Sequence, residues 1–106
     1  MLNRTVLTLV VMVAALNAGE TATKAGFGEA VQPVLQQNCA MCHNDKVASG
    51  GLSVQQFSDP ATIDSRRETW ERIVTKLRTG EMPPPGAPSV PVEKRDAFVD
   101  FLQNAF

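Results

Sequence analysis

Both cysteines of the chain and its only histidine lie within five residues, in the segment Cys39-Ala40-Met41-Cys42-His43. This C-x-x-C-H spacing is typical of c-type haem attachment. Two residues between the cysteines let one turn of chain present both sulfurs along one edge of a porphyrin, where each thiol adds to a vinyl group. The histidine that follows can then offer its imidazole to the iron. The motif therefore predicts one haem c, bound covalently through Cys39 and Cys42, with His43 as an iron ligand.

Three other uses of these residues are less favoured. A zinc site takes four ligands, usually Cys and His, and this chain offers only three, all in one place. A thioredoxin-like redox pair would stand near a βαβ pattern, and the remaining chain has little strand character. A plain structural disulfide between Cys39 and Cys42 is the third alternative.

Residues 1–18 are typical of a secretory signal peptide, with Arg4 near the start, an apolar stretch over residues 6–16, and cleavage between residues 18 and 25. Eleven helical residues span about 16 Å, whereas the hydrocarbon core of a bilayer is about 30 Å thick. We therefore expect a periplasmic protein with no stable membrane anchor. Covalent haem c is also assembled outside the bacterial cytoplasm. The second predicted unit, residues 26–106, is the haem-binding domain.

The mature chain would hold about 88 residues, and the loss of Arg4 would bring its formal charge from −1 to about −2. This charge is too small and too evenly spread to indicate a nucleic-acid partner. A domain of this size buries a low fraction of its surface and often needs a cofactor or a disulfide to fold. A haem would supply an apolar centre.

The first half of the mature chain predicts a helical segment that leads into the motif. Apolar residues recur at helical spacing between Phe27 and Asn38, with Pro33 either opening a shorter helix or kinking a longer one. Residues 44–51 are expected to form a loop. A short helix capped by Ser53 should follow, with three apolar residues packed in the core or against the haem: Leu52, Val54 and Phe57.

The strongest helix signal runs from Arg66 to Thr79. Ser65 and Glu68 have the spacing of a capping box, and Gly80 stands where a C-terminal glycine belongs. An apolar stripe marks the buried face: Trp70, Ile73, Val74 and Leu77. The opposite face is either solvated or a docking surface for a redox partner, and it carries Arg67, Glu71, Arg72, Lys76 and Arg78.

Five prolines between Glu81 and Pro91 predict an extended loop of little freedom. A last helix is expected from Pro91 to Ala105, with five residues facing inward: Val92, Phe98, Phe101, Leu102 and Ala105. The fold class is therefore all-α, with three to four short helices around one covalently bound haem.

The second iron ligand cannot be a histidine, because His43 is the only one in the chain. Methionine is the next usual choice and raises the reduction potential. Beyond the signal peptide only Met41 and Met82 are left, and Met41 lies inside the attachment turn. Met82 lies in a loop stiffened by prolines, which loses little entropy on holding a thioether against iron. The alternative is that Met82 is a packed apolar residue.

Three stretches together resemble the planctomycete-type cytochrome c domain, a branch of the small monohaem class I cytochromes c. They are the run from Val34 to Asn44, the Gly50-Gly51-Leu52 turn, and the run from Trp70 to Pro85. The resemblance covers roughly residues 31–104. It implies a cytochrome c fold whose N- and C-terminal helices cross beside the haem, with axial ligands His43 and Met82. It adds Trp70 to the haem pocket, where Leu52 and Pro83 are further candidates.

These features favour an electron carrier that cycles between Fe(II) and Fe(III), rather than an enzyme, because six-coordinate iron has no open position for a substrate. Its partners would be donor and acceptor redox proteins that dock transiently. A fixed place in a dehydrogenase or oxidase complex is the other form of the same function. The alternative function is a haem peroxidase or gas-binding cytochrome in which Met82 is labile or does not bind.

Overall fold

The computed structural model describes residues 24–106, so the predicted signal peptide, residues 1–18, lies outside the described residues. The described chain is all helical and contains no β-strand, which confirms the predicted fold class. Residues 24–106 therefore do not contain the βαβ unit that a thioredoxin-like redox pair requires. No helix within the same range has the length and apolar character needed to cross a bilayer.

The predicted N-terminal helical segment is present, and Pro33 divides it. Helix α1 spans Lys24–Ala30, and the single turn α2 spans Gln32–Val34 with Pro33 in its first turn. A π-helical turn, Leu35–Cys39, then continues directly into the motif. Proline is tolerated in a first turn, where its missing N–H is not needed, so Pro33 starts a new helix instead of kinking an old one.

The stretch after the motif forms two short 3-10 turns, Ser49–Gly51 and Val54–Phe57. The second is the predicted short helix, and Ser53 stands at its N-cap position as predicted but without a capping bond. Ser53 makes no side-chain bond to the turn, and its hydroxyl instead donates to Asp45 Oδ1 at 2.5 Å. The carboxylate is a strong acceptor, so this bond connects the turn to the preceding loop.

The next two helices are α3, Thr62–Ser65, and α4, Arg67–Thr79. The predicted capping box at the start of α4 is wrong. Ser65 is the last residue of α3, and its hydroxyl donates back to the Ala61 carbonyl at 3.3 Å. Glu68 pairs with Arg72 instead. A capping serine needs non-helical backbone, and Ser65 has none to offer because one helix follows another almost without a break.

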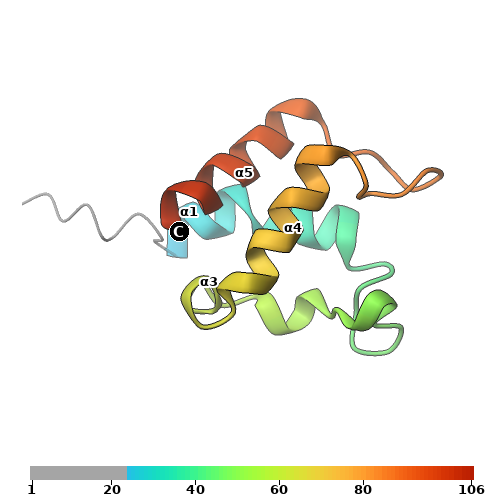
Figure 1. Ribbon diagram of the computed structural model, residues 1–106, viewed down its shortest axis with the longest axis horizontal. Helices are drawn as coiled ribbons and strands as arrows, with labels where there is room; N and C mark the ends of the chain where they lie inside the picture. The colour runs from blue at the N-terminus through green and yellow to red at the C-terminus, as the bar shows by residue number, and fades with distance from the viewer. Residues whose placement is uncertain (1–23) are drawn as a thin grey trace, which may run out of the picture.

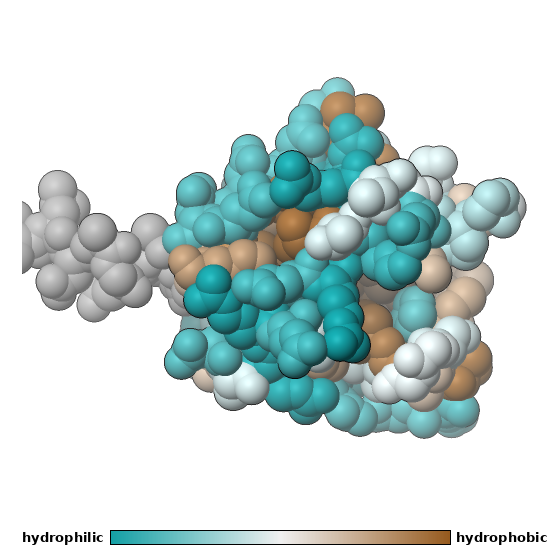
Figure 2. All heavy atoms as spheres, in the orientation of Figure 1, coloured by the Kyte–Doolittle hydropathy of each residue, from teal (hydrophilic) through white to brown (hydrophobic). Residues whose placement is uncertain are grey.

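Gly80 ends α4 in the left-handed conformation, with φ of 77°, as predicted. On the predicted apolar stripe Trp70, Val74 and Leu77 are buried, and Ile73 is half-buried. The charged side chains of α4 are exposed. Helix α4 crosses the front of Figure 1, and the same region of Figure 2 is mainly hydrophilic.

After an irregular loop, the last helix α5 spans Val92–Ala105, close to its predicted bounds. Phe98 and Leu102 are buried and Phe101 is half-buried, but the prediction that Val92 faces inward is wrong: its side chain is 57% exposed. The buried positions of α5 are Phe98, Val99 and Leu102, in the middle and later turns of the helix, and α5 packs on α1 and α4. Val92 lies one to two turns before that contact and points into solvent.

The helices meet around Trp70, whose side chain is fully buried. Its ring meets Phe57 edge-on at 5.5 Å and Phe27 edge-on at 5.9 Å, and Phe98 lies at 6.4 Å. The indole N–H is satisfied by a 3.1 Å bond to Thr62 Oγ1. Helices α1 and α5 pack against each other, as the resemblance implied for the N- and C-terminal helices, and α5 also packs on α4 (Figure 1). We call Trp70, Phe27, Phe57 and Phe98 the aromatic cluster.

The aromatic cluster gives a direct stability prediction. We expect Phe98→Ala to lower the free energy of unfolding by about 3–5 kcal/mol, because it leaves a cavity where a fully buried ring stood. Val92→Ala on the same helix should change it by less than about 0.5 kcal/mol, since Val92 is exposed. Denaturant titrations followed by circular dichroism measure both. Similar losses for the two variants would contradict the assigned core.

Candidate functional site

A cavity of about 380 Å³ opens beside the motif. Its walls come from the end of the π-helical turn, residues 49–57, one side of α4 and the start of the proline-rich loop. The volume falls in the range of cofactor sites, about 300–1,000 Å³. Five of the seven predicted site residues line it: Cys39, His43, Leu52, Met82 and Pro83.

The motif is folded into a compact turn by its own backbone. The Ala40 N–H donates to the Leu35 carbonyl at 2.8 Å, which closes the π-helical turn. The Cys39 carbonyl then accepts from the N–H groups of both Cys42 and His43, at 3.3 and 3.0 Å. Single π-helical turns often mark functional sites. Here the turn brings both cysteines and the histidine onto one short stretch.

The loop after the motif folds back and holds it. Ser49 N–H donates to the Cys42 carbonyl at 3.0 Å, and Val54 N–H donates to the His43 carbonyl at 2.8 Å. Asn44 fixes both sides of the turn, because its amide donates to the Ala40 carbonyl at 2.8 Å and its Oδ1 accepts from the Val47 N–H at 2.9 Å. The backbone around His43 is therefore held from two directions.

His43 is half-buried at the cavity wall, and its Nδ1 is buried without a hydrogen-bond partner. A buried polar atom with no partner is rare and is expected to have a specific use, such as a bond to an ion. A neutral imidazole nitrogen is also a common metal ligand. The unpaired ring nitrogen of His43 is the structural observation that indicates that the cavity suits a haem.

The two cysteines differ in their surroundings. Cys39 is half-buried and lines the cavity, and burial raises the pKa of its thiol to about 11. Cys42 is exposed and does not line the cavity. Both thiols are free in this structure, so the alternative of a disulfide between Cys39 and Cys42 is not observed. The Cys39 thiol stays protonated at neutral pH, because desolvation disfavours the thiolate.

Met82 reaches the cavity from the proline-rich loop. Its side chain is 38% exposed, its N–H donates to the Lys76 carbonyl at 3.1 Å, and the Met82–Pro83 peptide bond is cis. Asn38, next to Cys39, donates to the carbonyls of Pro88 and Ser89 at 3.3 and 3.4 Å. The loop is thus tied to α4 at one end and to the π-helical turn at the other.

Trp70 does not line the cavity, although the resemblance placed it near the haem. Its ring is enclosed in the aromatic cluster, and its indole N–H donates to Thr62 Oγ1. Phe57 belongs to both regions, because it contacts Trp70 and also lines the cavity.

Sequence reasoning missed the contribution of α4 to the cavity. Thr69, Ile73 and Lys76 line it at helical spacing, together with Arg66 just before the helix and Arg72. The Arg66 guanidinium lies over the Phe57 ring, 5.1 Å from its centre. The spacing 69, 73, 76 is the available signal, but the sequence pattern assigns Ile73 to the apolar stripe and Lys76 to the charged face, so it does not group these residues as one lining.

The donor set at the cavity suits a covalent haem. Soft thioether sulfur and imidazole nitrogen are both established ligands of haem iron. Apolar walls would cover the ring, and they are formed by Leu35, Leu52, Val54, Phe57, Ile73 and Leu77. Cationic side chains at the same cavity would suit the negatively charged propionates.

Comparison with known proteins identifies a family. The family model described as "Cytochrome C oxidase, cbb3-type, subunit III" matches residues 28–102, well over half of the chain. No curated protein and no solved structure is significantly similar to the chain.

Proposed function

Because this chain belongs to the family described as cytochrome c oxidase, cbb3-type, subunit III, and so contains a small monohaem cytochrome c domain, we propose that it is an exported electron carrier with His/Met-ligated iron. The family itself implies haem-based electron transfer. The match also confirms the resemblance to small monohaem cytochromes c, and the branch that it names is the cbb3-type one. The observation that carries the proposal is that Met82, which is remote in sequence from the motif, lines the same cavity as Cys39 and His43.

In this proposal each residue has one task. Cys39 and Cys42 would form the two thioether bonds to one haem c, and His43 and Met82 would bind its iron. The haem supplies the one-electron couple Fe(II)/Fe(III). The chain fixes both ligands, excludes water with its apolar walls, and sets the reduction potential through ligand identity and burial.

The compact turn around the motif supports the role of His43. Two backbone bonds to the Cys39 carbonyl and one from Val54 to the His43 carbonyl fix the main chain on which the imidazole stands. A ligand held in this way needs little rearrangement when the iron changes its charge. Fast electron transfer benefits from such fixed ligands, because the surroundings are already organised for both states.

The proposal places the protein in the periplasm, delivered by the signal peptide of residues 1–18. Its partners would be a donor and an acceptor redox protein that dock briefly, since such encounters use small interfaces. The alternative of a fixed place in a dehydrogenase or oxidase complex involves the same chemistry. Elution of the native protein alone or within a larger assembly decides between them.

Absorption spectra of the oxidised and reduced protein test the proposal. We expect the spectrum of haem c, with a methionine-to-iron charge-transfer band in the oxidised form. Carbon monoxide added to the reduced protein should cause only slow or no spectral change, because Met82 occupies the sixth position. Rapid binding of carbon monoxide, with no charge-transfer band, would contradict the proposal and favour the peroxidase or gas-binding alternative.

A further inference from the structure

We propose that Lys76 is a positioning residue for Met82: it holds the ligand loop against the cavity with its backbone carbonyl and, through Glu81, with its side chain. The inference rests on the proposed ligation of iron by Met82. It adds a residue of α4 that neither the motif nor the family match assigns. We refer to Lys76 and Glu81 together as the loop clamp.

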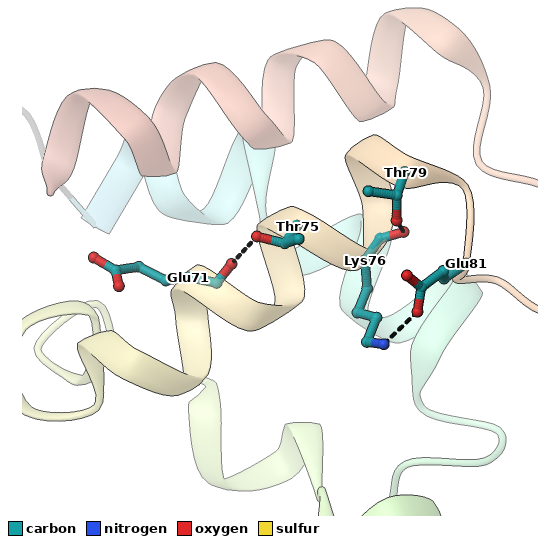
Figure 3. Close-up of polar contacts among 5 residues, drawn as sticks. All are labelled: Glu71, Thr75, Lys76, Thr79 and Glu81. Atoms are coloured by element: carbon teal, nitrogen blue, oxygen red, sulfur yellow. Dashed lines mark hydrogen bonds and ion pairs between the residues drawn. The ribbon is translucent and has the colours of Figure 1, made fainter.

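The loop clamp joins the last turn of α4 to Glu81 and Met82. The Lys76 ammonium binds the Glu81 carboxylate, and the Lys76 carbonyl accepts the Met82 N–H at 3.1 Å. The hydroxyl of Thr79 donates to the same carbonyl at 3.4 Å (Figure 3). Gly80 reverses the chain between them, so the loop returns alongside the helix that it has just left.

The clamp differs from the other ion pairs of α4. Arg67–Glu71 and Arg72–Glu68 are both spaced four residues apart and connect the helix only to itself. Lys76–Glu81 leaves the helix and reaches the loop. Lys76 also lines the cavity, so the same residue contacts the site directly. An ion pair that crosses from helix to loop constrains the loop, whereas one within a helix does not.

Met82 needs such a constraint. Its side chain is 38% exposed and is not enclosed by the core, so packing alone holds it weakly. The other side-chain tether of the loop, from Asn38, reaches Pro88 and Ser89, several residues further on. Of these hydrogen bonds and ion pairs, the ones nearest to Met82 in the sequence therefore come from the end of α4.

The expected effect is modest, because both charged side chains are about half exposed, at 49% and 56%. An exposed ion pair of this kind changes an equilibrium by up to about fivefold. Breaking it should raise the fraction of protein in which Met82 has left the iron. An added ligand binds in proportion to that fraction, so its apparent affinity reports the clamp.

The experiment titrates imidazole into the oxidised haem protein and its variants. We expect Lys76→Gln and Glu81→Gln each to bind imidazole about two- to fivefold more tightly than the unsubstituted protein. The two substitutions change the net charge in opposite directions. A general electrostatic effect on the haem would therefore move them in opposite directions, whereas loss of the clamp moves both the same way.

Arg67→Gln is the matched control. It breaks an exposed ion pair on the same helix, removes the same charge as Lys76→Gln, and lies outside the cavity lining. Its imidazole affinity should match that of the unsubstituted protein. The exchanged pair, Lys76→Glu with Glu81→Lys, should restore the original affinity. Equal affinities for Lys76→Gln, Glu81→Gln and the unsubstituted protein would overturn the proposal, as would an equal gain in Arg67→Gln.

Amide hydrogen exchange separates this inference from the proposed function. The charge-transfer band of the unsubstituted protein tests whether Met82 binds iron at all. Exchange of the Met82 N–H, which donates to Lys76, tests the clamp in either case. We expect about two- to fivefold faster exchange in Lys76→Gln and in Glu81→Gln, and no change in Arg67→Gln. An intact band with unchanged exchange would refute the clamp and leave the electron carrier standing.

Discussion

Met82→Ala is expected to lower the reduction potential of the protein by on the order of 0.1 V or more, within the range of about 0.8 V over which axial ligands act. A thioether ligand favours the ferrous state and so raises the potential. Its removal from the cavity also leaves an iron position open to carbon monoxide. Potentiometric titration followed by visible absorption measures the first effect, and carbon monoxide binding to the reduced protein measures the second.

Met41→Ala is the control for this experiment. Met41 is 76% exposed within the motif and does not line the cavity, so its loss removes the same chemistry from a place where no ligand is needed. Its potential should equal that of the unsubstituted protein. If Met82→Ala left the potential unchanged and still bound no carbon monoxide, the assignment of Met82 as a ligand would be wrong.

The second large effect concerns covalent attachment. Replacing Cys39 and Cys42 together with alanine should leave haem that acidified organic solvent removes completely, because the cofactor is then held only by its ligands and by packing. The unsubstituted protein should keep its haem through the same treatment. Absorption of the extracted and protein-bound fractions gives the result directly.

The single replacements make the test specific. Cys39→Ala and Cys42→Ala each leave one thiol, so each should keep a fraction of haem that resists extraction. The half-buried Cys39 lines the cavity while Cys42 is exposed, yet one bond from either is enough to prevent release. Haem that resisted extraction from the double variant would show that attachment occurs elsewhere.

The α4 helix shows how much of the fold can be predicted from sequence. Its apolar stripe and Gly80 are local features whose meaning does not depend on distant residues, and they placed the helix and its end correctly. The start of α4 was harder to predict than its end. Ser65 and Glu68 have the same spacing whether the chain before them is extended or helical, and only the structure shows α3 in that position.

In the candidate site, too, some residues could be predicted from the sequence and others could not. Cys39, His43 and Met82 could be predicted because their side chains carry chemistry that few other residues offer. Thr69 and Lys76 could not, because their part depends on where α4 lies relative to the motif. Hydropathy identifies one buried face of a helix, and a second face that lines a cavity with mixed polar and apolar residues looks the same as one in water. The prediction that Val92 faces inward was wrong for a related reason, because an apolar residue is buried only where a neighbouring element covers it.

The position of Trp70 also determines what intrinsic fluorescence reports about this protein. It is the only tryptophan of the chain, and no tyrosine accompanies it. Its fully buried ring touches Phe27 of α1 and Phe98 of α5. Intrinsic emission therefore comes from a single point where the two ends of the described chain meet α4. A red shift of the Trp70 emission on unfolding therefore reports when water reaches the contact between α1, α4 and α5, and no added fluorescent label is needed.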